Sequence, residues 1–571
     1  MDINLLKNRP FFLVDEDIKW VTDTLAGMNE EEKTGQLFCM TAYISDEKTL
    51  KDFAQKYRAG GVMARPMDTN ESLMELVSLL QKNSKIPMLI AANLEAGANG
   101  VSKEATRIGT QMAVAATGDP KYAGLLGEVC GSESAALGCN WAFAPVIDID
   151  FNFRNPITNT RTYGNDWHFV KRCGIEYVRA LQKHGVAASI KHFPGDGCDE
   201  RDQHLVTSIN DLSVEEWDRT YGEVYRACIE AGALTLMAGH ILQPAYSRLL
   251  KPGIRDEDIL PASLSGELLN GLLRKKLSFN GLIVTDATTM AGFNIPMERR
   301  RAVPQAINAG CDMFLFTRNL EEDYSFMADA VNDKVISPER LNDAVTRILG
   351  LKAALGLHRK NNLADRKKVK AVVASGEHKD WTREIADRSI TLAKNIQDAL
   401  PVTPEKYRSI LFYSIDPVGE SVAYGPSNAS ANQMLVDKLK RAGFEVTVWQ
   451  PDDAFGTEGM LGSSEAIKNK YDLIIYSSNL ATKSNQTTVR IEWAQPMGAN
   501  VPVYVNSVPT IFIGFENPYH LLDTPRVKTL INTYGSSKAV IDALVEKLMG
   551  ISAFTGTSPV DVFLGKWDTR L

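Results

Sequence analysis

The segment Lys191-His192-Phe193-Pro194-Gly195-Asp196-Gly197 ends an apolar run and opens a loop rich in charged residues. The run, residues 185–190, is typical of a buried strand, and the loop continues through Asp199-Glu200-Arg201-Asp202-Gln203-His204. In α/β barrels the catalytic residues lie in the loops that follow the carboxyl ends of the strands. We therefore expect the chemistry of this protein to be concentrated at this loop.

Other short apolar segments occur on both sides of this strand, and helical patterns separate most of them. They cover residues 36–40, 60–64, 87–92, 141–149, 234–237, 281–285 and 313–316. Fully apolar strands that alternate with helices indicate a parallel sheet covered on both faces. We predict an α/β fold with a (β/α)8 TIM-type barrel over residues 1–357, and a doubly wound sheet is the alternative.

A second α/β series follows the barrel. The charged run 359–370 and an expected helix over 381–394 form a predicted linker, residues 358–398. Expected strands at 410–413, 446–449, 473–476, 503–506 and 510–514, with a helix over 432–442, then predict a smaller α/β sandwich domain over residues 399–571.

The composition argues against nucleic-acid and membrane binding. The chain has 571 residues, 44% of them hydrophobic, and a net charge of −7 with both signs interspersed. There is no basic stripe for nucleic acid and no polybasic or long apolar segment for a membrane, so neither partner is expected. The lack of a secretion signal and seven scattered cysteines without CxxC spacing predict a cytoplasmic protein with reduced thiols.

The polar residues at the expected strand ends are the candidates for chemistry. They are Glu95, Asp150, Lys191, His192, Asp202, His204, His240 and Asp286. Carboxylates mixed with imidazoles and an amine predict a hydrolytic or proton-transfer pocket at the barrel mouth. No metal site or cofactor is predicted, because no ligand pair has helical spacing and no Gly-Lys-Ser/Thr loop opens a helix.

Two of these candidates have competing explanations. Asp286 follows Gly-Leu-Ile-Val-Thr, where a buried unpaired carboxylate would be costly, and catalysis and helix capping are equally compatible with it. Asp202 and His204 lie two residues apart, so the carboxylate can orient the imidazole for general acid/base work. The alternative is a solvated charged loop that contains a histidine by chance.

The motif closely resembles the signature of glycoside hydrolase family 3, in its β-N-acetylglucosaminidase branch. That signature is Lys-His-Phe-Pro-Gly-His-Gly followed by an Asp-x-His dyad, which here is Asp202-Gln203-His204. Further segments resemble family landmarks in the family's order, among them 60–62, 140–148, 161–164, 261–265, 281–287, 309–313, 389–395 and 517–519. The resemblance covers nearly the whole chain.

The resemblance implies the role of each site residue. It assigns the nucleophile to Asp286, the acid/base to His204 and its carboxylate partner to Asp202. It places sugar binding on Arg161, Lys191 and His192, and the barrel mouth adds Asn93, Glu95 and His240 as substrate-binding candidates. Two positions depart from the family pattern: Asn93 stands where the family has an Asp that holds sugar hydroxyls, and Asp196 stands where it has a His.

The implied activity is retaining, exo-acting hydrolysis of terminal β-linked N-acetylhexosamine through a glycosyl-enzyme. Attack by the substrate's own acetamido group is the mechanistic rival, but it leaves Asp286 without a role as nucleophile. A neutral imidazole does not repel an anion, so phosphate is a possible acceptor and a glycoside phosphorylase is an alternative. A β-glucosidase of the same family is another, and a non-enzymatic sugar-binding protein is the least favoured class.

Overall fold

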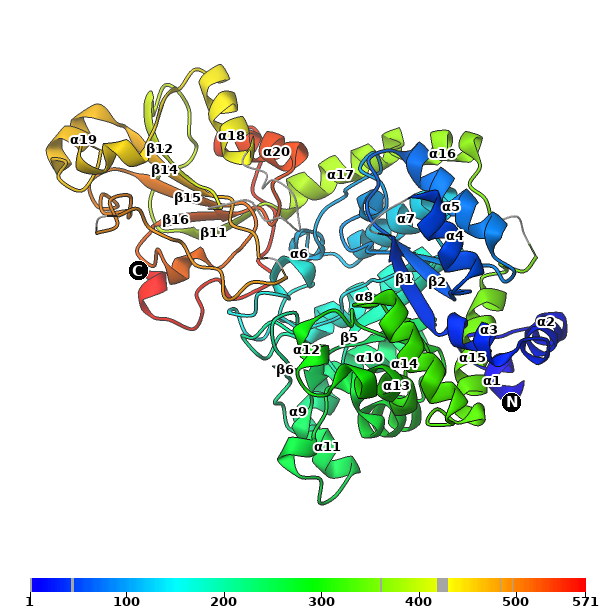
Figure 1. Cartoon of the computed structure of the whole chain (residues 1–571). Coiled ribbons are helices and arrows are strands. Elements are labelled where there is room, and N and C mark those ends of the chain that lie inside the picture. The colour runs from blue at the N-terminus through cyan, green and yellow to red at the C-terminus, as the bar shows by residue number, and fades with distance from the viewer. Residues whose placement is uncertain are drawn as a thin grey trace. The chain divides into compact units, whose positions relative to one another are not determined.

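The computed structural model describes residues 3–42, 46–359, 362–417, 430–456, 458–482, 484–495 and 497–571. The chain divides into two compact units. The first comprises Met1–Ile108, Pro120–Thr158 and Asp166–Lys379, and the second comprises Gly109–Asp119, Asn159–Asn165 and Asp380–Leu571. Each unit contains its own sheet (Figure 1).

The first unit contains an eight-stranded parallel sheet in the order β10-β1-β2-β3-β4-β5-β7-β9. A parallel bridge between Val284 and Met313 connects the two ends of that order, so the predicted (β/α) barrel is confirmed. Its strands are β1 Phe38–Ala42, β2 Gly61–Ala64, β3 Leu89–Ala92, β4 Trp141–Ala142, β5 Ala187–Phe193, β7 Thr235–Ala238, β9 Leu282–Thr285 and β10 Phe314–Leu315.

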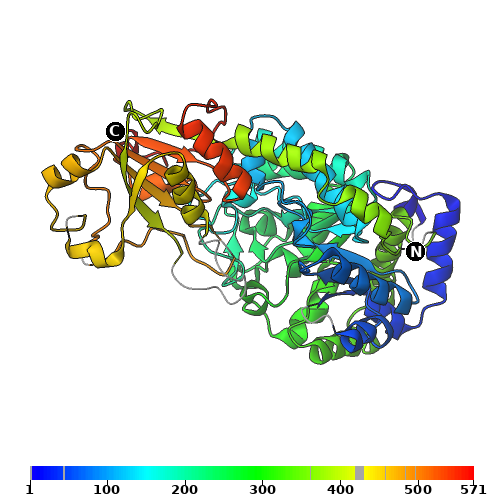
Figure 2. The ribbon, with the colours of Figure 1, turned by 90° about the horizontal axis from the view of Figure 1, so that it is seen from above.

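Helices surround these strands in both ribbon views (Figures 1 and 2). The helices cover the outer face of the barrel and side chains fill its interior, so both faces of the apolar strands are buried. The helices are α1 Ile3–Lys7, α2 Asp15–Ala26, α3 Glu30–Gln36, α4 Glu47–Gln55, α5 Asn70–Asn83, α7 Lys121–Ala136, α8 Trp167–Gln182, α9 Val214–Trp217, α10 Glu223–Glu230, α11 Pro244–Leu250, α12 Ala291–Asn294, α13 Arg299–Ala309, α14 Leu320–Asn332, α15 Pro338–Ala354 and α16 Arg366–Val372.

The helix starts expected from the sequence are present. Asn29 and Ser213 each form a capping box with the Glu three residues later, at the starts of α3 and α9. Ser337 caps α15, which has Pro338 in its first turn. These caps satisfy backbone N–H groups that have no partner within the helix.

Two predicted barrel strands need correction. Helix α3 extends to Gln36, so β1 begins only at Phe38. The strand expected over 141–149 is regular only at Trp141–Ala142, because Pro145 has no N–H to donate to the ladder. The chain still runs beside β5, where Pro145 O accepts from Lys191 N at 3.3 Å and Ile147 N donates to Lys191 O at 2.9 Å.

The second unit has a six-stranded sheet in the order β11-β16-β15-β14-β12-β13, parallel except for the antiparallel β11/β16 pair. The strands are β11 Thr391–Asn395, β12 Ser409–Ile415, β13 Glu445–Val448, β14 Leu473–Ser478, β15 Thr510–Gly514 and β16 Thr529–Asn532. Its helices include α6 Gln111–Ala116, α18 Ser430–Arg441, α19 Ser464–Lys470 and α20 Lys538–Leu548. The predicted smaller α/β domain is confirmed.

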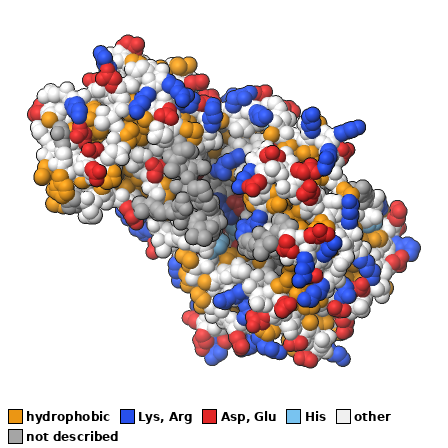
Figure 3. Space-filling view, turned by 45° about the horizontal axis from the view of Figure 1, so that its top comes forward, with side chains coloured by type: hydrophobic (Ala, Val, Ile, Leu, Met, Phe, Trp, Pro, Cys, Tyr) orange, Lys and Arg blue, Asp and Glu red, His pale blue; other side chains and the backbone are white. Residues whose placement is uncertain are grey.

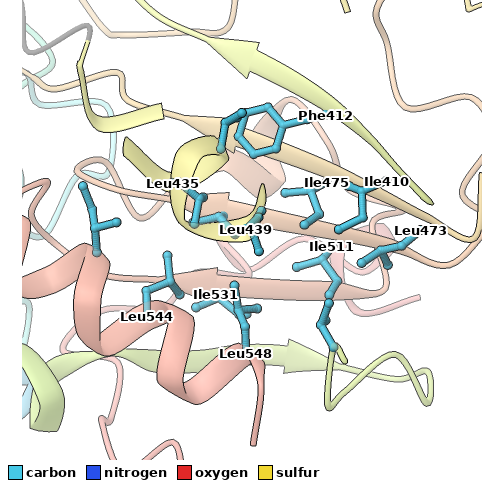
Figure 4. Close-up of a cluster of buried hydrophobic side chains, with 14 of the residues drawn as sticks. Ile410, Phe412, Leu435, Leu439, Leu473, Ile475, Ile511, Ile531, Leu544 and Leu548 are labelled. Atoms are coloured by element: carbon cyan, nitrogen blue, oxygen red, sulfur yellow. The ribbon is translucent and has the colours of Figure 1, made fainter. Parts of the chain in front are cut away.

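Alternate residues of these strands form the core of the second unit with α18 and α20 (Figure 4). Ile410 and Phe412 of β12 point to the same side as Ile475 of β14, as the period of two predicts, and pack with Leu435 of α18 and Leu544 of α20.

Two element predictions in this part of the chain are wrong. The helix expected over 381–394 is α17 Gly376–Ser389, and 391–395 is strand β11, paired with β16. Residues 503–506 form a turn, with Ser507 N donating to Tyr504 O at 2.8 Å and Val503 exposed. Strand β16, which the sequence pattern did not single out, lies between β11 and β15 instead.

Charged side chains of both signs are interspersed on the face drawn in Figure 3. Within the described residues, no helix has the length and apolar character needed to cross a membrane. All seven cysteines are free thiols.

A buried ion-pair cluster connects the outer layer of the barrel to β9. The fully buried Asp312 carboxylate accepts from Arg274 at 2.7 Å, from Arg340 at 2.8 Å and from the backbone N–H of Ile283 at 2.9 Å. Burial raises the pKa of Asp312, but the guanidinium groups outweigh it and hold that pKa below its ordinary value. The cluster is therefore ionised, and it fixes the start of the strand that ends at Asp286.

We expect Asp312→Ala to lower the free energy of unfolding by about 3–5 kcal/mol, because two guanidinium groups lose their buried partner. Urea unfolding followed by circular dichroism measures this. The matched control is Asp329→Ala, which removes the exposed partner of Arg300 and should change stability by less than about 1 kcal/mol. Equal effects of the two variants would contradict a structural role for the cluster.

Candidate active site

Asp286 follows the last residue of β9 and is held by backbone contacts on both sides. Its N–H donates to Ala238 O of β7 at 2.8 Å, and its Oδ1 accepts from Ala287 N at 2.7 Å. The residue is 9% exposed. Its other oxygen, Oδ2, lies 3.9 Å from Nε2 of His192. One carboxylate oxygen is thus fixed by the backbone and the other faces an imidazole.

His192 lies near the end of β5 between two carboxylates. Its Nδ1 lies 2.7 Å from Oδ2 of Asp148, and its backbone N–H donates to Oδ1 of Asp148 at 3.0 Å. Asp148 is fully buried. A carboxylate on Nδ1 fixes the ring orientation and leaves Nε2 directed at Asp286.

The neighbouring imidazoles determine the charge state of Asp286. Burial raises the pKa of its carboxyl, but the neighbouring histidines, His192 first among them, and the hydrogen bond from Ala287 N outweigh burial and hold the pKa below its ordinary value. The carboxylate is therefore ionised at neutral pH, as a nucleophile must be.

Asp202 and His204 form the pair predicted from their spacing. Oδ1 of the buried Asp202 lies 2.7 Å from Nδ1 of His204 and also accepts the His204 backbone N–H at 2.8 Å. The His204 side chain is 23% exposed. The imidazole is thus oriented through one nitrogen while the ring keeps access to solvent, which suits exchange of protons with a substrate.

The loop that carries this pair is attached to the loop after Asp286. Ala291 N donates to His204 O at 3.0 Å, and Gly292 N donates to Gln203 O at 3.1 Å. A Cβ at Gly292 would lie 2.5 Å from Gln203 O, so the two loops pack in direct backbone contact. The structure thereby brings the predicted acid/base and the predicted nucleophile together.

Lys191 and Glu95 form an ion pair next to this group, with Nζ 2.6 Å from Oε1. Lys191 is buried and Glu95 is partly buried. The Glu95 carboxylate therefore compensates the charge of Lys191 at the end of β5. Asn93, two residues before Glu95, is exposed.

His240 differs from the other histidines. Its Nδ1 lies 2.8 Å from Ser263 Oγ, and its Nε2 lies 3.1 Å from the carbonyl oxygen of Ala287. Burial lowers its pKa to about 4, so it is neutral. Both ring nitrogens bind protein groups, and the second supports the backbone next to Asp286. Substrate binding by His240 stays a prediction.

The roles of two other predicted residues, Arg161 and Asp150, stay predictions. Arg161 ends a short 3-10 turn, Asn159–Arg161, that belongs to the second unit, so its role in sugar binding stays a prediction from the resemblance. Asp150 accepts a hydrogen bond from the Thr158 hydroxyl, and its role at the barrel mouth stays a prediction.

The glycines of the motif are required by the packing of its loop. Gly195 has φ +120° and Gly197 has φ +107°, in the region that favours glycine. A Cβ at Gly195 would lie 2.2 Å from the Tyr221 ring, and one at Gly197 would lie 1.9 Å from Ile149 O. The loop therefore packs against its neighbours without room for a side chain at these two positions.

The sequence interpretation missed the supporting residues Asp148, Gln203 and Ser263. Asp148 could have been suspected, because a carboxylate that ends an apolar segment needs a buried partner. Nothing in the sequence pattern indicated Gln203 or Ser263. Among the described residues, no group of three or more His, Cys, Asp or Glu side chains is arranged to hold a metal ion.

A parallel barrel with an ionised carboxylate, an Asp-His pair and a buried lysine at its strand ends has the groups that a glycoside hydrolase needs. Residues 30–351 match the N-terminal domain of glycosyl hydrolase family 3. The chain belongs to this family and is a glycoside hydrolase.

Relatives cover almost the whole chain. A β-N-acetylglucosaminidase/β-glucosidase of Cellulomonas fimi is 53% identical over 98% of this chain and 99% of its own length. The solved structure of the β-glucoside phosphorylase BglX is 43% identical with a TM-score of 0.93 and covers 100% of both chains. A family 3 β-N-acetylglucosaminidase from Paenibacillus sp. str. FPU-7 has the same fold, with 24% identity, a TM-score of 0.79 and coverage of 95% and 100%.

We expect Asp148→Asn to lower kcat/KM by about 10–100-fold, because a charge-assisted hydrogen bond to His192 worth roughly 1.5–3 kcal/mol is lost. Steady-state kinetics on a nitrophenyl β-glycoside measure the effect. Asp256→Asn, an exposed carboxylate paired with Arg248, is the control and should remain within about twofold of the parent. An unchanged Asp148→Asn would show that His192 needs no orienting carboxylate.

Proposed function

We propose that the enzyme cleaves terminal β-linked N-acetylglucosaminides and β-glucosides with retention of configuration. Asp286 acts as the nucleophile, and His204 acts as the acid/base with Asp202 as its partner. The observation that carries the proposal is the attachment of the Asp202–His204 loop to the loop after Asp286, through two backbone hydrogen bonds. The sugar specificity follows the two activities in the name of the Cellulomonas fimi relative.

In the first step an oxygen of Asp286 forms a bond to the anomeric carbon while the bond to the aglycone oxygen breaks. His204, which Asp202 orients through Nδ1 at 2.7 Å, donates a proton to that oxygen. The products are a glycosyl-enzyme ester and the free aglycone. The low pKa of Asp286 keeps it ionised for attack.

In the second step His204, now neutral, takes a proton from water as the water oxygen attacks the anomeric carbon and Asp286 leaves. Two displacements at the same carbon give a product with the configuration of the substrate. Lys191, held by Glu95 at 2.6 Å, and His192, held by Asp148 at 2.7 Å, are rigid donors that suit sugar hydroxyls.

We expect Asp286→Ala to reduce kcat by at least about 10⁴-fold, since the covalent pathway is lost with the nucleophile. In the parent enzyme, a 2-fluoro sugar with a good leaving group should label the peptide that contains Asp286, as shown by mass spectrometry of the digest. Substrate assistance by the acetamido group predicts no such adduct. Parent enzyme that turns over the substrate but never forms the adduct would disprove the two-step mechanism.

Phosphorolysis is the second candidate, and a specific feature favours it. The acid/base is an imidazole rather than a carboxylate, and His192 lies 3.9 Å from Asp286, so these groups do not repel an incoming anion. A full-length relative of solved structure, 43% identical, is named a β-glucoside phosphorylase. In that reaction phosphate replaces water in the second step and the product is a sugar 1-phosphate.

We expect inorganic phosphate to raise the rate of aglycone release when breakdown of the glycosyl-enzyme limits turnover, because the anion meets no carboxylate at the acid/base position. Nitrophenyl β-glycosides of N-acetylglucosamine, N-acetylgalactosamine and glucose, with and without phosphate, test this, with the sugar product identified by chromatography. Sulfate at matched ionic strength is the control. Free sugar as the sole product in phosphate would leave hydrolysis as the activity.

A further inference from the structure

Asp196, the sixth residue of the motif, contacts two parts of the site: the Asp148–His192 pair and the loop of Asp202 and His204. It is 1% exposed. Its Oδ1 accepts from Asn155 Nδ2 at 2.8 Å and from Gly197 N at 2.7 Å, and its Oδ2 accepts from Gln203 Nε2 at 3.4 Å. The last contact reaches the residue between Asp202 and His204.

Gln203 in turn contacts the barrel. It is fully buried, and its Oε1 accepts the backbone N–H of His240, just beyond β7, at 2.8 Å. Its carbonyl oxygen accepts Gly292 N at 3.1 Å. Side chain and backbone of Gln203 therefore fix the segment from which Asp202 and His204 project.

The backbone of Asp196 is attached to the other half of the site. Its N–H donates to Asp148 Oδ1 at 2.8 Å, and the second oxygen of Asp148 holds His192. Its carbonyl oxygen accepts the Tyr221 hydroxyl at 2.5 Å. Asp196 thus connects the support of His192 to the loop of His204.

The carboxyl of Asp196 is suited to a neutral role. Burial raises its pKa to about 8, and the neighbouring Asp148 contributes further to that rise. Asp148 accepts the backbone N–H of Asp196, so the two carboxyl groups are neighbours, and one proton on Asp196 removes their repulsion. An asparagine keeps the two contacts to Oδ1, but its Nδ2 would face Gln203 Nε2, which is also a donor, so it loses the contact to Gln203.

We propose that Asp196 is a positioning residue for proton transfer: through Gln203 it holds the loop on which Asp202 orients His204. This inference rests on the proposed acid/base role of His204. Loss of a residue that acts only through His204 should slow substrates whose leaving group must be protonated. It should hardly slow substrates whose leaving group departs without a proton. A residue that merely stabilises the fold affects both kinds of step equally.

The test compares kcat/KM for phenyl and 2,4-dinitrophenyl β-glycosides of the sugar that the parent turns over fastest, using the full-length chain. We expect Asp196→Ala to lose on the order of 100-fold on the phenyl glycoside, which needs acid catalysis, and less than about fivefold on the dinitrophenyl glycoside. Asp196→Asn should show the same split between the two substrates, because its amide keeps the contacts to Oδ1 and loses the one to Gln203.

Glu200→Gln is the matched control. Glu200 is an exposed carboxylate on the same loop, 3.7 Å from Arg154, and its change should alter neither rate by more than about twofold. If Asp196→Ala does not fold, as judged by its unfolding midpoint, Gln203→Met breaks the same connection with Asp196 in place and should show the same split between substrates.

His204→Ala separates failure of this inference from failure of the proposed function. If His204→Ala shows the split and both Asp196→Ala and Gln203→Met lose equally on the two substrates, the positioning role is wrong and the acid/base assignment stands. If His204→Ala itself shows no split, the acid/base assignment is wrong and the inference falls with it.

Discussion

Closure of eight parallel strands into a barrel determines where this chain can do chemistry. Strands buried on both faces must be apolar, so polar side chains concentrate where the strands end. Because the strands are parallel, these ends meet at one edge, and residues as distant in sequence as His192 and Asp286 come within 3.9 Å. The Asp312 cluster reinforces this arrangement by fixing the start of β9 to the helices outside it.

The site built on this frame works by pairing each charged group with a fixed partner. Lys191 has Glu95, and His204 has Asp202. Asp286 lies 3.9 Å from His192 and accepts the Ala287 N–H, and its pKa stays below the ordinary value. In the proposed mechanism the acid/base is an imidazole and not a carboxylate, which is why water and phosphate are the two acceptors worth comparing.

The sequence predicted strands well where apolar residues run without interruption and poorly where backbone hydrogen bonds decide. Segments such as 87–92 and 281–285 lie within a residue or two of β3 and β9. Segment 141–149 has strand-like composition, but Pro145 interrupts its ladder, and 391–395 pairs as the antiparallel strand β11 although its composition suits a helix. Pairing partners are a tertiary property, so composition alone does not reveal them.

The sequence by itself determined the barrel and the short-range pair Asp202 and His204, because apolar strand segments and a two-residue spacing are local properties, and the resemblance of its motif indicated the family. Only the tertiary structure decided how the other groups are used. It committed both nitrogens of His240 to Ser263 and Ala287, and it connected Asp196 through Gln203 to the acid/base loop. These contacts join residues from different loops. The hydrogen-bond partner of each buried polar group therefore depends on the folded geometry alone.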